Sequence, residues 1–172
     1  MNVTFTRTAE RRYRVSVEGP GVVTSYMEPA PGYDSRLPHD MAHFVVENEL
    51  GIAGGVFGQL ARGGHASTFH PVGGRPRTRV VRRGERIATT SRDDAMLSEK
   101  IVTIACRVWN NGVPQAIPAA GIDDVTAAAL TRVCREFDVV SAQWSRLAVG
   151  ESMTLPWRAP AGHAQKRGAR HR

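Results

Sequence analysis

The sequence predicts an α+β fold, in which a small antiparallel sheet packs against three or four helices. An N-terminal meander of three strands and a C-terminal edge strand form this sheet. Apolar and polar residues alternate near the N-terminus, apolar residues recur at helical spacing in the middle and C-terminal parts, and a short strand-like segment follows the last helical stretch. With 172 residues, of which 41% are hydrophobic, the chain has the size of one domain with its own core. We therefore predict a single domain over residues 1–158.

Residues 3–7 and 13–17 carry the period-two alternation of half-buried strands, and a polar break separates the two runs. This arrangement predicts a β-hairpin. The Gly-Pro-Gly turn at 19–21 leads into a third short strand at 22–27, which ends at the Pro-rich segment 29–32. The opening of the chain is thus predicted to be an antiparallel meander.

Proline is favoured in the first turn of a helix because its missing N–H has no partner there, so Pro38 marks a helix that continues to Leu50. Glycines interrupt residues 52–61, which form either a second short helix or a kinked continuation. Apolar residues recur at helical spacing over 93–110 and again from 122 or 123 to 147. A last strand at 153–157 is predicted to lie at an edge of the sheet because it contains Pro156.

Residues 63–90 are interpreted as a basic, loop-rich insertion with a possible hairpin that pairs 79–81 with 86–88, and residues 159–172 as a disordered basic tail. The formal net charge of +7 is concentrated in these two segments. Basic residues in such segments are either merely solvated or attract polyanions without sequence selectivity. No aromatic residues are interleaved to stack on bases, and no helix-turn-helix or zinc-finger spacing occurs. The residues assigned to weak polyanion binding are Arg75, Arg77, Arg79, Arg82 and Arg83, together with the tail.

No apolar window approaches the length of about 20 residues that a transmembrane helix needs, and no signal-peptide pattern follows Met1. We therefore expect a cytoplasmic protein without membrane contact. Cys106 and Cys134 each lie within an apolar helical pattern, so we expect both to be reduced, buried thiols.

The feature with most chemical content is the cluster His39, Asp40, His43 and Glu47, which falls within a sector of about 100° on one helix. Imidazoles one turn apart can bind one metal ion, as in the H-E-x-x-H zinc motif. Asp40 takes the position of that motif's glutamate, which orients or deprotonates a water, but its side chain is one methylene shorter. The sequence thus predicts the metal ligands His39, His43 and Glu47 and the catalytic residues Asp40 and Glu47.

The third ligand stays open, because Glu47 lies about 12 Å along the helix axis from His39. Other candidates for it are Glu49, His65, His70 and Asp34. Three interpretations of the cluster remain: a metal site, a buried polar network that stabilises the helix, and a metal-free acid-base site. No G-x-S-x-G elbow or P-loop is present.

The segment His39-Asp40-Met41-Ala42-His43 resembles the H-D-x-x-H element of the zinc-binding family involved in coenzyme Q biosynthesis. That resemblance implies a zinc site, but the glutamate that continues the family's motif corresponds to Gly55 here. The segment 36–64 also resembles uncharacterised proteins of actinobacteria. We therefore predict a metal-binding protein that acts as a small enzyme and uses zinc or another divalent transition metal. The alternative is a non-catalytic binding or regulatory protein that contacts nucleic acid or an acidic partner through its arginines.

Overall fold

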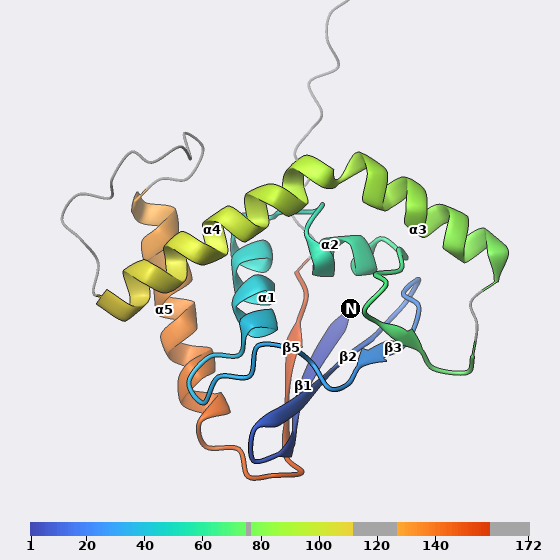
Figure 1. Ribbon diagram of the computed structural model, residues 1–172. Helices are drawn as coiled ribbons and strands as arrows, with labels where there is room; N and C mark the ends of the chain where they lie inside the picture. Colours follow the sequence, from blue (N-terminus) through green and yellow to red (C-terminus); the bar gives the residue numbers. More distant parts are fainter. Residues whose placement is uncertain (75–76, 112–126, 159–172) are drawn as a thin grey trace, which may run out of the picture.

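The computed structural model describes residues 1–74, 77–111 and 127–158. Its sheet has five antiparallel strands in the order β4-β3-β2-β1-β5 (Figure 1). The α+β class and the N-terminal meander are therefore confirmed. The strands are β1 (Asn2–Ala9), β2 (Arg12–Glu18), β3 (Ser25–Met27), β4 (His70–Pro71) and β5 (Ser152–Pro156).

The strand β5 returns from the C-terminal part of the chain to the outer side of β1, where Phe5 lies opposite Met153. It is an edge strand, as Pro156 predicted. The third strand is shorter than expected, since only Ser25–Met27 pair with β2. The sheet also continues one strand further, because His70 pairs with Tyr26.

The described helices are α1 (His39–Leu50), α2 (Val56–Ala61), α3 (Thr78–Thr90), α4 (Arg92–Asn111) and α5 (Ala127–Trp144). Figure 1 shows α1 in the middle of the helical layer, with α4 crossing it and α5 alongside, and the contacts agree with this arrangement. The predicted start of the last helix at 122–126 and the basic tail at 159–172 lie outside the described residues. None of the described helices is long and apolar enough to cross a membrane.

Helix α1 is the central helix of the core. Its residues from Met41 to Glu47 are all buried, because the sheet, α4 and α5 surround it. On the sheet side, the ring of Phe44 packs edge-on against Phe5 of β1 and Phe57 of α2, with ring centroids 6.2 and 5.4 Å apart. A helix buried on nearly every side has no solvated face, so any polar residue in it must find partners inside the protein.

The interpretation of 79–88 as a hairpin within a loop-rich insertion is wrong, because these residues belong to the helix α3. Val80, Gly84 and Ile87 recur at helical spacing, and these residues form the least exposed side of the helix. Gly84 lies within the helix and not at a turn. A Cβ at this position would lie 2.9 Å from the backbone nitrogen of His65. Glycine here allows α3 to pack closely on the preceding loop.

Candidate metal centre

The first turn of α1 is fixed in place by the loop before it. The backbone N–H of His39 donates to the carbonyl of Gly32 at 3.1 Å. Gly32 has a φ of +68°, and a Cβ on it would lie only 2.7 Å from the Cβ of His39. This position therefore requires glycine for both its conformation and its close approach to the helix. The result is a defined position for His39 at the surface end of α1.

His39 and His43 lie one helical turn apart and point their rings at each other. Their Nε2 atoms are 3.2 Å apart, and the ring planes are 82° from parallel. His43 is only 4% exposed, as its apolar neighbours in the sequence predicted, whereas His39 is exposed. The pair thus joins a buried imidazole to an accessible one.

Glu99 of α4 completes the group. Its Oε2 lies 3.4 Å from Nε2 of His43, and one potential ligand atom from each of His39, His43 and Glu99 lies within 4.8 Å of the other two. In a tetrahedral site, metal–ligand distances of about 2.0 to 2.1 Å place neighbouring ligand atoms about 3.3 Å apart. The separations of His43 Nε2 from His39 Nε2 and from Glu99 Oε2, 3.2 and 3.4 Å, match that value.

The inner nitrogen of His43 is held by a buried chain of hydrogen bonds. Ser98 of α4 donates its hydroxyl proton to Oε1 of Glu47 at 3.1 Å, and Nδ1 of His43 lies 3.1 Å from the same hydroxyl oxygen. When Glu47 is ionised, the single hydroxyl proton of Ser98 goes to Glu47, so Nδ1 of His43 is the donor in its bond to Ser98. The Nε2 atom of a neutral His43 then carries a lone pair, directed toward His39 and Glu99.

Glu47 is fully buried and is occupied by the beginning of α2. Its carboxylate accepts the backbone N–H groups of Val56 at 2.9 Å, Phe57 at 2.9 Å and Gly58 at 3.3 Å. A Cβ on Gly55 would lie 2.1 Å from the Glu47 carboxyl carbon, so the close approach of the two residues requires glycine at this position. Burial raises the pKa of Glu47 to about 7, while the hydrogen bonds from Gly58, Ser98, Phe57 and Val56 act in the opposite direction.

The structure does not bring Glu47 into the group of ligand atoms, and Glu99 takes that place. The reason is the axial distance along α1, since Glu47 lies two turns from His39 and reaches α2 instead. The pKa of His43 is lowered by burial, and Glu99 partly opposes this effect. A neutral imidazole is the form that binds a metal ion.

Asp40 is hydrogen-bonded to the sheet, although its charge also interacts with those of His39 and Glu99. Its carboxyl group forms a hydrogen bond with the hydroxyl of Tyr13 on β2, a residue whose side chain is buried. Burial raises the pKa of Asp40, and the bond from Tyr13 opposes that shift. Burial and the neighbouring Asp40 also raise the pKa of Tyr13. Asp40 therefore connects the start of α1 to the sheet.

The other predicted third ligands lie elsewhere. Asp34 accepts the backbone N–H groups of Arg36 and Leu37 in its own loop. His70 is on β4 with its ring 6.0 Å from that of Tyr26, and Glu49 lies 4.0 Å from Arg158. His65 packs against α3 at Gly84. The candidate ligand Glu99, which the sequence analysis missed, had one indirect signal, because the adjacent Ser98 is a polar residue on the buried stripe of α4.

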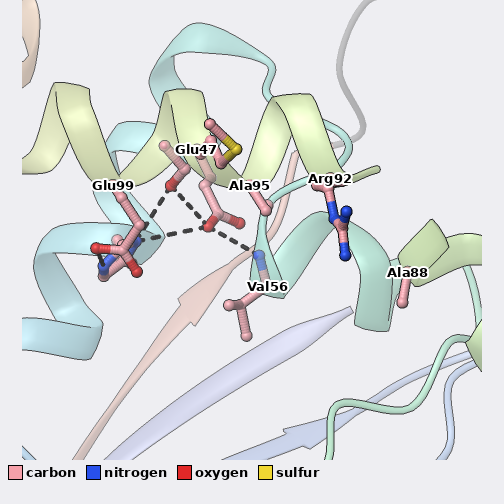
Figure 2. A pocket seen from close by; sticks show the side chains of 10 residues that line it. Glu47, Val56, Ala88, Arg92, Ala95 and Glu99 are labelled. Carbon is pink, nitrogen blue, oxygen red and sulfur yellow. Dashed lines mark hydrogen bonds and ion pairs between the residues drawn. The ribbon is translucent and has the colours of Figure 1, made fainter. Parts of the chain in front are cut away.

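A cavity of about 340 Å³ opens beside His43 and Glu99. Figure 2 shows Glu99 at one end of it and Arg92 at the other, with Ala95 and Val56 between them. Polar ligand atoms at one end of a largely apolar cavity are typical of binding and catalytic sites. The two cysteines contribute no ligand to the group: both are free thiols, Cys134 is buried, Cys106 is partly buried, and burial raises the pKa of each.

Comparison of the chain with protein-family models, with curated proteins and with solved structures finds no match. The chemistry of the site therefore has to be argued from its own residues.

Proposed function

We propose that this protein binds a divalent transition metal ion through His39, His43 and Glu99 and acts as a small metal-dependent enzyme. The observation that carries the proposal is the position of Nε2 of His43, which lies 3.2 Å from Nε2 of His39 and 3.4 Å from Oε2 of Glu99, both close to ligand-to-ligand distances. A lone pair directed at a carboxylate is repulsive unless a proton or a cation lies between them. Since burial disfavours the protonated ring, a metal ion fits this arrangement best.

Two imidazoles and one carboxylate are the ligand set of many zinc enzymes and of non-haem iron enzymes, and they leave coordination positions open. We propose zinc first, with iron and manganese as alternatives. A divalent metal in such a site supplies Lewis acidity and can activate a water molecule. The open positions face a cavity, which gives a small substrate room to approach the metal.

The remaining cluster residues position this group in our proposal. Ser98 and Glu47 hold the ring of His43 in one orientation and tautomer, as partners of metal-binding histidines commonly do. Asp40 anchors the start of α1 on Tyr13, so we no longer propose it as the base. Glu47 likewise has no free lone pair aimed at the metal position, because α2 and Ser98 use its carboxylate.

The test is a zinc titration of the metal-free protein in competition with a chromophoric chelator. We expect one equivalent to bind, and we expect His39→Ala and Glu99→Gln each to weaken binding by about 100-fold or more. Glu49→Gln is the matched control. Glu49 is a carboxylate on α1, the helix of both histidines, and it forms an ion pair with Arg158. Retention of wild-type affinity in both ligand variants would refute the proposed site.

A second candidate function, binding of nucleic acid, is favoured by the form of α3. Arg79, Arg82 and Arg86 recur at helical spacing on one face of this helix and are exposed. An ordered row of guanidinium groups can contact successive phosphates, which a solvated loop does less well.

This candidate is tested by the binding of a short DNA duplex, measured by fluorescence anisotropy over a range of salt concentrations. The triple variant Arg79→Gln/Arg82→Gln/Arg86→Gln is expected to lose at least about tenfold in affinity and to show a shallower salt dependence. The control is Arg107→Gln/Arg132→Gln/Arg135→Gln, which removes the same charge from exposed positions on α4 and α5. Equal losses in both variants would show that only net charge matters and would exclude α3 as a binding surface.

A further inference from the structure

Two cavities flank the histidine pair, and they differ in what they offer a ligand. The first, of about 340 Å³, has His43 and Glu99 in its lining, and the second, of about 320 Å³, has His39. Each cavity also has one arginine in its lining, Arg92 in the first and Arg36 in the second. The two cavities differ in whether the guanidinium of this arginine already has partners within the protein.

The guanidinium of Arg36 is already occupied. It lies 4.4 Å from the ring centroid of Trp109 and donates to the side-chain oxygen of Asn110 at 3.3 Å. The side chain of Arg92 is exposed and forms no hydrogen bond or ion pair with the side chains or backbone of the residues that the structure describes. Its side chain extends from α4 toward α2 at the end of the cavity opposite Glu99 (Figure 2). The first cavity therefore has the arginine that is available to a ligand.

The position of Arg92 is fixed by the junction between α3 and α4. Arg62 donates to the hydroxyl of the buried Ser91 at 2.6 Å, directly before Arg92. Arg92 and Glu99 are separated by two helical turns, so they lie on the same face of α4 about 10 Å apart along its axis. Ala95 and Met96 lie between them on that face, and Val56 and Ala88 complete the apolar wall.

The charges of this lining leave Arg92 uncompensated. Among the lining residues, the carboxylic acids are Glu47 and Glu99, and the one strong base is Arg92. The carboxylate of Glu47 is used by the N–H groups of α2, and a metal ion at the histidine pair would neutralise Glu99. A guanidinium in this position matches the fork geometry of a carboxylate.

We infer that the first cavity binds a small organic carboxylate, with Arg92 holding the carboxylate, the apolar wall contacting an aliphatic chain, and the reacting group placed at His39, His43 and Glu99. This substrate class rests on the proposed metal site. Arg92 is thus a specificity-determining residue rather than a ligand. Its distance from Glu99 along α4 selects for substrates whose carboxylate is separated from the reacting group by an aliphatic spacer.

The experiment uses adipate as a probe, because one of its carboxylates can bind the zinc ion while the other reaches Arg92. Hexanoate has one carboxylate and a methyl end, so it serves as the matched probe. Binding of each to the zinc-loaded protein is measured by calorimetry after the zinc titration described above. We expect adipate to bind at least about tenfold more tightly than hexanoate, and Arg92→Gln to abolish that difference.

The control variant is Arg36→Gln, which lies beside the second cavity and should leave both affinities unchanged. Arg92→Lys should recover only part of the preference for adipate, because an ammonium lacks the planar fork. Zinc-loaded protein that binds both probes equally, or whose preference for adipate survives in Arg92→Gln, would overturn this inference and leave the metal site standing. Protein that binds no zinc in the first titration would remove the metal site, and this substrate class with it.

Discussion

The two halves of the cluster differ in their surroundings, although they share His43, whose Nδ1 belongs to the inner half and whose Nε2 belongs to the outer half. On the inner side, His43, Ser98 and Glu47 are 4%, 2% and 0% exposed, and hydrogen bonds join them in one chain. On the outer side, His39 is exposed, and 66% of the Glu99 side chain is accessible to solvent. The inner half is built like a part of the core and the outer half like a binding site.

This difference indicates that stability and metal binding are largely carried by different residues. Buried polar groups lower stability unless each has its partner, so the loss of an inner residue leaves unpaired groups in the core. Exposed groups are solvated whether or not they are paired, so the loss of an outer residue should weaken metal binding without lowering the stability of the metal-free protein. Four predictions follow this comparison from the largest effect on stability to the smallest.

Glu47→Ala should have the largest effect, because it removes the acceptor of Val56, Phe57 and Gly58 in the buried start of α2. We expect a loss of about 3 kcal/mol or more in the free energy of unfolding, measured with urea. Glu49→Ala on the same helix is the control, since Glu49 forms an ion pair at 4.0 Å with the exposed Arg158, and should cost less than about 1 kcal/mol. Equal costs for the two variants would show that Glu47 does not hold α2.

Ser98→Ala should come second. It removes the hydroxyl that accepts from His43 and donates to Glu47, so we expect a loss of about 1 to 2 kcal/mol in stability. Zinc affinity should fall by about 10-fold to 100-fold, because the ring of His43 loses its orientation. Chelator competition measures this fall, and Ser141→Ala, a buried serine of α5, is the control. Unchanged zinc affinity in Ser98→Ala would break the proposed link between the two halves.

Asp40→Asn tests whether Asp40 belongs to the metal site or to the contact with the sheet. The amide keeps the shape of the carboxyl group but weakens the hydrogen bond with Tyr13, so we expect a loss of about 1 kcal/mol. Tyr13→Phe should give a loss of similar size, and the double variant should lose less than the sum of the two. Zinc affinity is expected to stay within about threefold of wild type. A fall of tenfold or more in zinc affinity would return Asp40 to the metal site.

His39→Ala and Glu99→Gln should have the smallest effect on the metal-free protein, within about 0.5 kcal/mol, because both side chains are exposed. Their effect should appear only with metal. At a free zinc concentration of about 100 times the dissociation constant, the wild type should gain about 2.7 kcal/mol, and both variants should gain almost none. Thermal unfolding with and without zinc measures this difference. A large loss of stability without zinc would place these residues in a structural network instead.

The sequence predicted four of the five strands because each of these four is signalled locally, whereas the two-residue strand β4 was not predicted. The alternation around Val3, Phe5 and Val15 is visible in the chain, and these residues are buried as expected. The helix α3 was missed because the glycines and prolines of the stretch around it indicated loops, whereas Gly84 lies inside the helix and its lack of a side chain serves the packing against His65. Such a contact depends on tertiary structure and leaves no periodic signal.

The candidate site was half predictable for the same reason. His39 and His43 lie on one helix, so their spacing alone brings them together. Glu47 shares their sector on α1, but the sequence could not show that α2 would use its carboxylate. Glu99 comes from α4, and only the crossing of α4 over α1 brings it to His43 (Figure 1). A helical wheel describes one helix and cannot supply a ligand from another.

We propose that one metal ion is held jointly by His39, His43 and Glu99. Anomalous diffraction at the zinc edge from crystals grown with one equivalent of zinc tests it most directly. We expect a single strong peak about 2.0 to 2.2 Å from Nε2 of both histidines and from a carboxylate oxygen of Glu99. Ser98 should still join His43 to Glu47. A peak at other residues, or no peak between these three side chains, would contradict it.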